Sequence, residues 1–193
     1  MSLNSETPPE NGPAIVRQAL GTLLTQPAQH ADLIAESHSL EINIAAPHPV
    51  YFVGLSDIAN GRLLSAAILQ GWRYLVLSGE TPIAAANITA PNEGEPKFTH
   101  ISYGPFARNT IEGIGRAEAD ISEKDYTLRL LDIPSLYVVS LWFHGADDRL
   151  MPLAPSNRAL EPYRIYTEEE MIQVLVPRAV ERLESDEPVE PVG

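Results

Sequence analysis

The chain has 193 residues, a formal net charge of −13 and no cysteine. One domain of this length buries enough surface to fold without disulfides or a structural metal ion. The absence of thiols excludes disulfides, thiolate zinc sites and cysteine nucleophiles. Lys97 and Lys124 are the only lysines, which argues against nucleic-acid binding because that depends on clustered basic side chains. The sequence has no apolar run of membrane-spanning length and no recognisable secretory signal. We therefore expect a soluble cytoplasmic protein that binds neither nucleic acid nor membranes.

The N-terminal part of the chain predicts a disordered tail followed by a helix. Residues 1–12 are polar and proline-containing, so they have too little apolar content to order themselves. From Pro13 onward, apolar residues recur at helical spacing, and the helix ends before Pro27 because the residue preceding a proline leaves helical geometry. Similar patterns predict a short helix at 32–36, strands at 40–44 and 50–54, and a helix from Ser56 to Leu69 that stops at Gly71.

A three-stranded meander is predicted between residues 72 and 103. Trp72–Leu77 and Ile83–Thr89 are apolar segments joined by a turn at Gly79, and Phe98–Tyr103 follows a polar loop. Alanine is a weak strand former, so the run Ala84–Ala86 has two alternative interpretations: small side chains that let a helix approach the sheet, or a poor strand carried by its neighbours. After the meander, Asn109 or Thr110 can cap a helix to about residue 119.

The most apolar part of the chain, residues 126–145, predicts a central hairpin. Tyr126–Ile133 and Leu136–Phe143 are strands joined by a turn at Pro134 and Ser135. The second strand is apolar on both faces, which is typical of a strand in the middle of a sheet covered on both sides.

The C-terminal part predicts an edge strand and a long helix. Arg149–Leu153 is a possible edge strand closed by prolines. Thr167 and Glu170 have the spacing of a capping box, and the apolar stripe that follows continues to Leu183, with a kink expected at Pro177. Residues 185–193 are acidic and proline-containing, so we expect a disordered tail. The prediction is a single domain over residues 13–184.

The predicted fold class is α+β, with a largely antiparallel sheet packed by an N-terminal, a middle and a C-terminal helix. This order of elements and the acidic charge resemble those of type III secretion chaperones, although residues 32–71 have no counterpart there and no diagnostic motif is present. The resemblance implies a dimeric, chaperone-like protein that binds another protein.

The sequence contains one local cluster that could carry chemistry. His144 is followed by Asp147 and Asp148 just after the central strand, where a rigid sheet can hold an acid, a base or a metal ligand at an accessible end. His100 joins this cluster if its strand lies adjacent. The alternative is a polar turn, in which the glycine makes the corner and the aspartates bond local backbone amides. Phosphate-binding, hydrolase, zinc-protease and dinucleotide motifs are absent, so no cofactor and no metal are predicted.

Two functions remain open at this point. The first is a non-enzymatic protein-binding module that self-associates as a homodimer, because a central strand apolar on both faces needs cover that about three helices do not obviously supply. Aromatic residues concentrate in or beside the strands, where they pack in the core, line a ligand pocket or form an interface. The second is a small hydrolase or metal-dependent enzyme that uses the histidines and aspartates at the end of the central strand.

Overall fold

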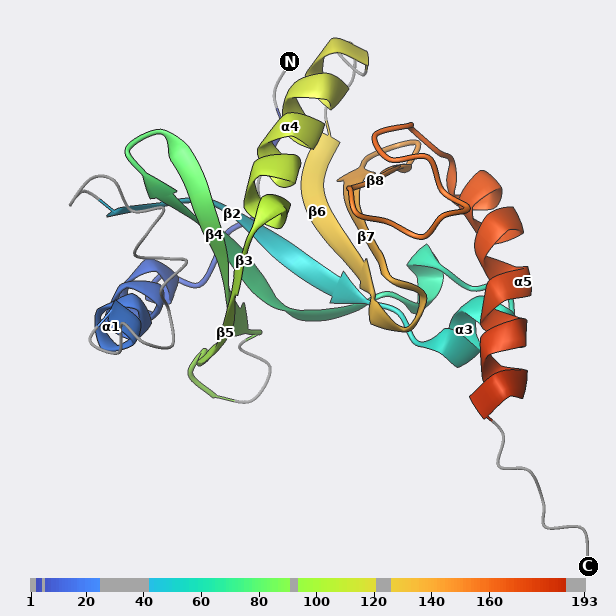
Figure 1. The fold of residues 1–193 in the computed structure, drawn as a ribbon, viewed down its shortest axis with the longest axis horizontal. Coiled ribbons are helices and arrows are strands. Elements are labelled where there is room, and N and C mark those ends of the chain that lie inside the picture. The colour runs from blue at the N-terminus through green and yellow to red at the C-terminus, as the bar shows by residue number, and fades with distance from the viewer. Residues whose placement is uncertain (1–2, 5, 25–41, 91–93, 121–125, 187–193) are drawn as a thin grey trace, which may run out of the picture.

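The computed structural model describes residues 3–4, 6–24, 42–90, 94–120 and 126–186 (Figure 1). The strands form one mostly antiparallel sheet. In spatial order they are β5 (Phe98–Tyr103), β4 (Thr81–Thr89), β3 (Ile68–Ser78), β2 (Ile42–Phe52), β6 (Tyr126–Ile133), β7 (Val138–His144) and β8 (Arg149–Pro152), and β1 (Leu3–Asn4) also pairs with β6. This α+β architecture confirms the predicted fold class.

Helices pack on both faces of the sheet. Figure 1 shows α4 (Pro105–Asp120) over the middle of the molecule, with α1 (Gly12–Leu24) and α5 (Glu168–Asp186) at opposite ends. Val16 of α1 packs with Trp72, Tyr74 and Val76 of β3, whereas Ala107 of α4 packs with Leu75 on the other face. The short helix α3 (Leu55–Ala59) lies beside α5. None of the helices in the described part of the chain is long and apolar enough to cross a membrane.

Local sequence signals are confirmed in the meander and at the start of α5. Strands β3, β4 and β5 pair in sequence order, and Gly79 makes the first turn with a φ of +60°. At the start of α5, the Glu170 amide donates to Thr167 Oγ1 at 3.2 Å and the Thr167 amide donates to Glu170 Oε2 at 2.8 Å, which is the predicted capping box. Ala85 packs against Ala107, so the small side chains of β4 do let a helix lie close to the sheet.

The central hairpin is covered on both faces. Leu130 and Leu141 pack with Ala117 of α4, whereas Leu131 and Trp142 pack with Leu175 of α5 on the opposite face. Each of these side chains is at most 4% exposed. Gly113 permits this packing, because a Cβ there would lie 2.8 Å from Leu153 and 2.9 Å from Leu141.

Several predicted boundaries are wrong. The helix expected from Ser56 to Leu69 ends at Ala59, because Gly61 adopts a left-handed φ of +72°. Gly71 lies inside β3 and ends no helix. The middle helix begins at Pro105, where the first turn of a helix tolerates proline, and not at Asn109 or Thr110.

The terminal segments also differ from the sequence-based expectation. Residues 1–12 are predicted to be disordered, whereas Leu3–Asn4 pair with β6 and Glu6 forms an ion pair with Arg129. At the other end, α5 runs through Pro177 to Asp186. The short helix expected at 32–36 and residues 187–193 of the expected acidic tail lie outside the described residues.

The parallel pairing of β2 with β6 joins the two halves of the sheet. Val50, Tyr51 and Phe52 lie opposite Leu130, Leu131 and Asp132. The meander therefore extends to one side of this junction, and the hairpin with β8 extends to the other. Side chains from opposite halves of the sequence meet where β3, β2 and β6 run side by side.

Candidate functional site

Four polar side chains form a row across neighbouring strands on the α4 side of the sheet. His100 of β5 lies opposite Asn87 of β4, Asn87 lies opposite Arg73 of β3, and Arg73 lies opposite His48 of β2. Residues that lie directly opposite each other in antiparallel strands share a face. The register of four strands therefore brings together residues that are up to 52 positions apart in sequence.

A chain of hydrogen bonds fixes the outer part of this row. Arg73 Nε donates to Asn87 Oδ1 at 2.9 Å, so Asn87 Nδ2 is the donor to His100 Nε2 at 3.3 Å. Thr99 Oγ1 donates to the Asn87 carbonyl and accepts from His100 Nδ1 at 3.3 Å. These roles require a neutral His100 with its proton on Nδ1. The chain of bonds therefore holds the Arg73 guanidinium in one orientation.

Arg73 is buried with most of its hydrogen-bonding capacity unused. The residue is 6% exposed, and the bond from Nε to Asn87 is its one hydrogen bond to the described residues. Burial lowers the pKa of Arg73, and the charge of Asp132 partly opposes this shift. Guanidinium groups remain protonated in proteins, so the charge persists. Both Nη groups are donors without a protein partner in the described structure.

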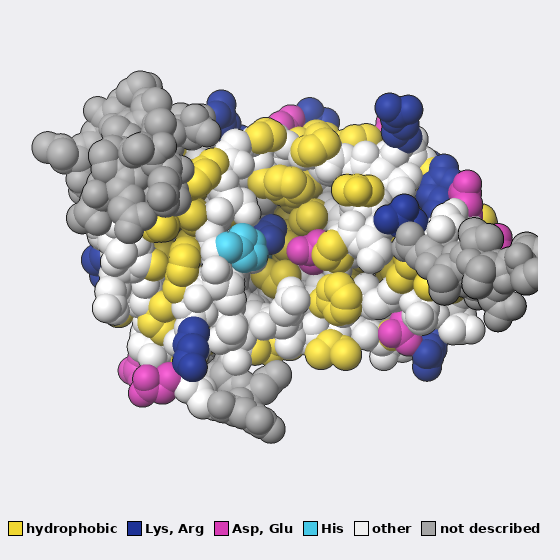
Figure 2. All heavy atoms as spheres, turned by 60° about the horizontal axis from the view of Figure 1, so that its bottom comes forward, with side chains coloured by type: hydrophobic (Ala, Val, Ile, Leu, Met, Phe, Trp, Pro, Cys, Tyr) yellow, Lys and Arg dark blue, Asp and Glu magenta, His cyan; other side chains and the backbone are white. Residues whose placement is uncertain are grey.

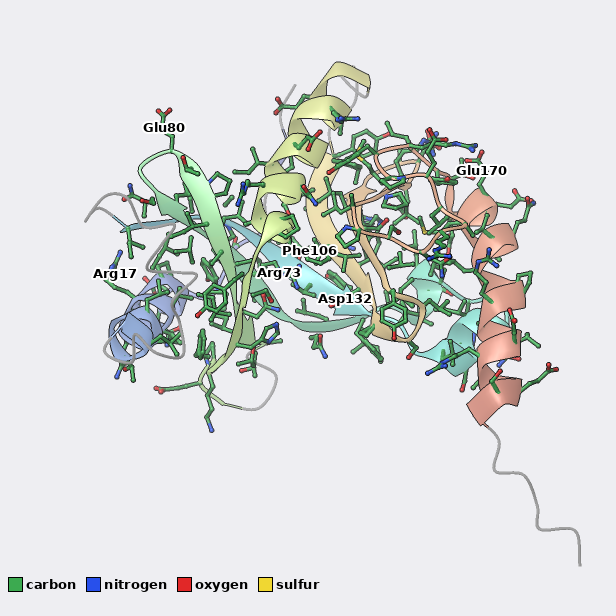
Figure 3. The ribbon with its side chains drawn as sticks, in the orientation of Figure 1. Arg17, Arg73, Glu80, Phe106, Asp132 and Glu170 are labelled. Atoms are coloured by element: carbon green, nitrogen blue, oxygen red, sulfur yellow. The ribbon has the colours of Figure 1, made fainter. Side chains whose placement is uncertain are left out.

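Asp132 of β6 carries a charge opposite to that of Arg73 and lies on the other side of β2. Burial raises the pKa of this carboxyl, and the charges of Arg73 and His100 oppose the shift. The Asp132 side chain makes no hydrogen bond or ion pair with the described residues. Figure 3 shows Arg73 and Asp132 in the same central region of the molecule, with Phe106 at the start of α4 nearby. The two charges therefore interact electrostatically without a direct contact between the side chains.

Two cavities lie near these charges; Asp132 lines one of them, and Arg73 lines neither. The first, of about 250 Å³, is lined by Val50, Gly71, Asn87 and His100. Gly71 lies opposite Val50, so the sheet surface has no side chain at that position. A Cβ on Gly71 would lie 2.0 Å from the Ile88 carbonyl oxygen, which excludes any other residue there.

The second cavity, of about 420 Å³, is lined by Asp132, by Ser156 and by apolar residues that include Phe106, Pro134 and Val139. Figure 2 shows this face of the molecule, with a histidine beside a hollow in which basic and acidic side chains lie among hydrophobic ones. Concave surfaces with a few polar groups among apolar walls are the usual form of small-molecule sites.

His48 ends the row inside the protein. The residue is 0% exposed, and its Nδ1 contacts the Ala46 carbonyl at 2.8 Å. Because a carbonyl can only accept, Nδ1 carries the proton and Nε2 is an acceptor; this Nε2 has no partner among the residues that the structure describes. Burial lowers the pKa of His48 to about 4, the Arg73 charge adds to this effect, and the bond to Ala46 opposes it. His48 is therefore neutral at pH 7.

The structure separates the candidate residues that the sequence grouped. Asp148 Oδ1 contacts Trp142 Nε1 at 3.0 Å, His144 Nδ1 at 2.8 Å and the Gly145 amide at 3.3 Å. One carboxylate oxygen thus meets three local donors, as in the polar-turn alternative. Asp147 lies exposed in the same turn.

His100 does not join His144, Asp147 and Asp148. Four strands lie between β5 and β7, so at a strand spacing of about 4.8 Å the two histidines are roughly 24 Å apart. The four residues do not form one site. Three of them belong to the turn after β7, and His100 belongs to the row that contains Arg73.

Arg73 and Asp132 are not among the site residues predicted from the sequence. Each is a charged residue near the middle or end of a strand that is otherwise largely apolar, in the runs WRYLVL and LRLLDI. A charge at such a position is costly unless something compensates it, so it is a signal of function. Comparison of the chain with family models, with curated proteins and with solved structures found no match to any of them.

Proposed function

We propose that this protein is a non-enzymatic binding module that holds a small organic anion at Arg73. The observation that carries the proposal is the guanidinium of the largely buried residue Arg73, whose Nη groups have no protein partner in the described structure. A carboxylate or a phosphate accepts two parallel hydrogen bonds from a guanidinium, which matches the donors left free.

The accessibility and the fixed position of the guanidinium support this proposal. Arg73 is 6% exposed as a residue, but its Nη atoms reach the protein surface, where a ligand can meet them. Arg73 is also held in place by Asn87, which is in turn bonded to His100. A donor that is fixed before binding loses little conformational entropy when the ligand arrives. The arrangement of Arg73 therefore suits a residue that binds a ligand better than a residue that only stabilises the fold.

The net charge of −13 works against anion binding at long range. At physiological ionic strength the screening length is about 8 Å, so distant carboxylates contribute little inside the hollow. Arg73 and His100 are the basic side chains that meet there. We therefore expect selective binding at this one place and weak binding of anions elsewhere.

An NMR titration tests the proposal. Acetate, 3-phenylpropionate and inorganic phosphate are added to the isotope-labelled protein while the Arg73 Nε–H and Gly71 amide signals are followed. We expect saturable shifts at these two groups for at least one of the anions. Arg73→Gln should abolish them. Arg62→Gln is the matched control, because it removes the same charge from an exposed arginine that pairs with Asp57, and it should bind like the wild type.

Two results would overturn the proposal. The first is the absence of any saturable shift at Arg73 with all three anions. The second is equal binding by the wild type and the Arg73→Gln protein. If Arg73→Gln does not fold, Arg73→Lys keeps the charge but removes the forked donor geometry, and it should weaken carboxylate binding while His100 keeps its wild-type signal pattern.

A further inference from the structure

The carboxylate of Asp132 favours a ligand that carries a positive group in addition to the anionic group held by Arg73. Asp132 lines a cavity on the face of the sheet that also carries Arg73, and it makes no contact with a basic group of the described chain. A bare anion bound at Arg73 would be repelled by this partly buried carboxylate. The repulsion becomes an attraction if the ligand carries a positive group on the Asp132 side. Arg73 can thus bind a negative group of the ligand, and Asp132 can bind a positive group of the same ligand.

The cavity at Asp132 supplies an apolar compartment for the rest of such a ligand. Its apolar wall includes Phe106, Pro134 and Val139, and its volume is about 420 Å³. Tyr137 borders the same cavity, is 80% exposed and has a left-handed φ of +55°. A non-glycine residue in this conformation is strained, and such residues cluster at binding sites. An exposed aromatic ring at the rim is available to cover an apolar ligand group.

We infer that the ligand is a small zwitterion of the α-amino acid class with an apolar side chain. The inference rests on the proposed function, because it assigns the ligand anion to Arg73. In this arrangement the ligand carboxylate accepts from the Nη groups of Arg73, and the ammonium group donates to Asp132. The side chain occupies the cavity beside Phe106. Both unpaired protein charges are then neutralised by one ligand.

A matched set of ligands tests each part of the inference. L-Leucine carries all three groups, 4-methylpentanoate lacks the ammonium group, and isoamylamine lacks the carboxylate. Binding is measured by titration calorimetry and by the Arg73 Nε–H signal. We expect leucine to bind about ten- to a hundredfold more tightly than either analogue, because each loses a charge-assisted hydrogen bond. L-Phenylalanine with 3-phenylpropionate and phenethylamine repeats the comparison for a larger side chain.

The variant Asp132→Asn separates the role of the ammonium group from that of the carboxylate. It should weaken leucine binding by about tenfold or more and leave 4-methylpentanoate binding unchanged or stronger. Equal affinity for leucine and 4-methylpentanoate in the wild type would overturn the zwitterion, while the anion site at Arg73 would stand. Failure of every carboxylate to bind in an Arg73-dependent way would overturn the proposed function as well, so the two failures are distinguishable.

Discussion

Arg73 on β3 and Asp132 on β6 lie on either side of β2. Their charges interact electrostatically, but the two side chains make no direct contact. Each is left without an ionic partner among the described residues. An internal ion pair would have satisfied both groups, so each is left available to a ligand group of opposite charge. The positions of these two residues therefore determine how substitutions, pH and ligands should affect the site.

His100 reports the arrangement of these charges. Burial and the Arg73 charge lower the pKa of His100, and Asp132 raises it. Removing Arg73 by Arg73→Gln should therefore raise the pKa of His100, and Asp132→Asn should lower it. The measurement is a pH titration of the His100 ring signals by NMR. Shifts of the same sign in both variants would show that the three side chains are not grouped as described.

The sequence predicts the fold better than the site for a physical reason. The turn at Gly79 and the capping box at Thr167 depend on residues close together in sequence, so local patterns reveal them. The row from His100 to Arg73 depends on strand register, and the approach of Asp132 depends on the parallel pairing of β2 and β6. Neither is encoded locally. Grouping His100 with His144 failed because the order of strands in the sheet is a long-range property.

The ionised carboxylate of Asp132 should lower the free energy of unfolding at neutral pH. Because burial raises its folded-state pKa above the unfolded value, its ionisation destabilises the fold as the pH rises through the folded-state pKa. Asp132→Asn should therefore increase the free energy of unfolding at pH 7 by about 0.5–2 kcal/mol, with the difference shrinking in acid. Urea unfolding at both pH values measures this.

The matched control is Asp57→Asn, which removes a carboxylate paired with Arg62 at 2.6 Å. This variant should be slightly less stable than the wild type at neutral pH, by up to about 1 kcal/mol. A loss of stability in Asp132→Asn as large as in a broken buried ion pair would instead make Asp132 a structural partner of Arg73.

His48 should make the protein sensitive to acid. Its folded-state pKa of about 4 lies below the ordinary value of 6.5, so the unfolded chain binds the proton first. Stability should fall as the pH drops from about 6.5 to about 4, by roughly 3 kcal/mol from this group alone. In His48→Asn, whose amide can still donate to the Ala46 carbonyl, the slope in this range should be smaller. An unchanged slope would mean that other groups cause the acid sensitivity.

Self-association remains a prediction. The central strands are covered on both faces, so a homodimer would have to use other apolar surface. Tyr137 and Ile68 are 80% and 66% exposed and are candidates for that surface. We expect light scattering after size exclusion to give a dimer mass, and Tyr137→Ser to lower the dimer fraction. A monomer mass for the wild type at low and physiological salt would refute the homodimer.

A crystal structure with a bound carboxylate tests the central claim most directly. Crystals grown with L-leucine or 3-phenylpropionate should show the ligand carboxylate within hydrogen-bonding distance of both Nη groups of Arg73, while Nε keeps its bond to Asn87. A direct Arg73–Asp132 ion pair that closes the hollow, with no ligand bound there, would contradict a binding site between these two residues.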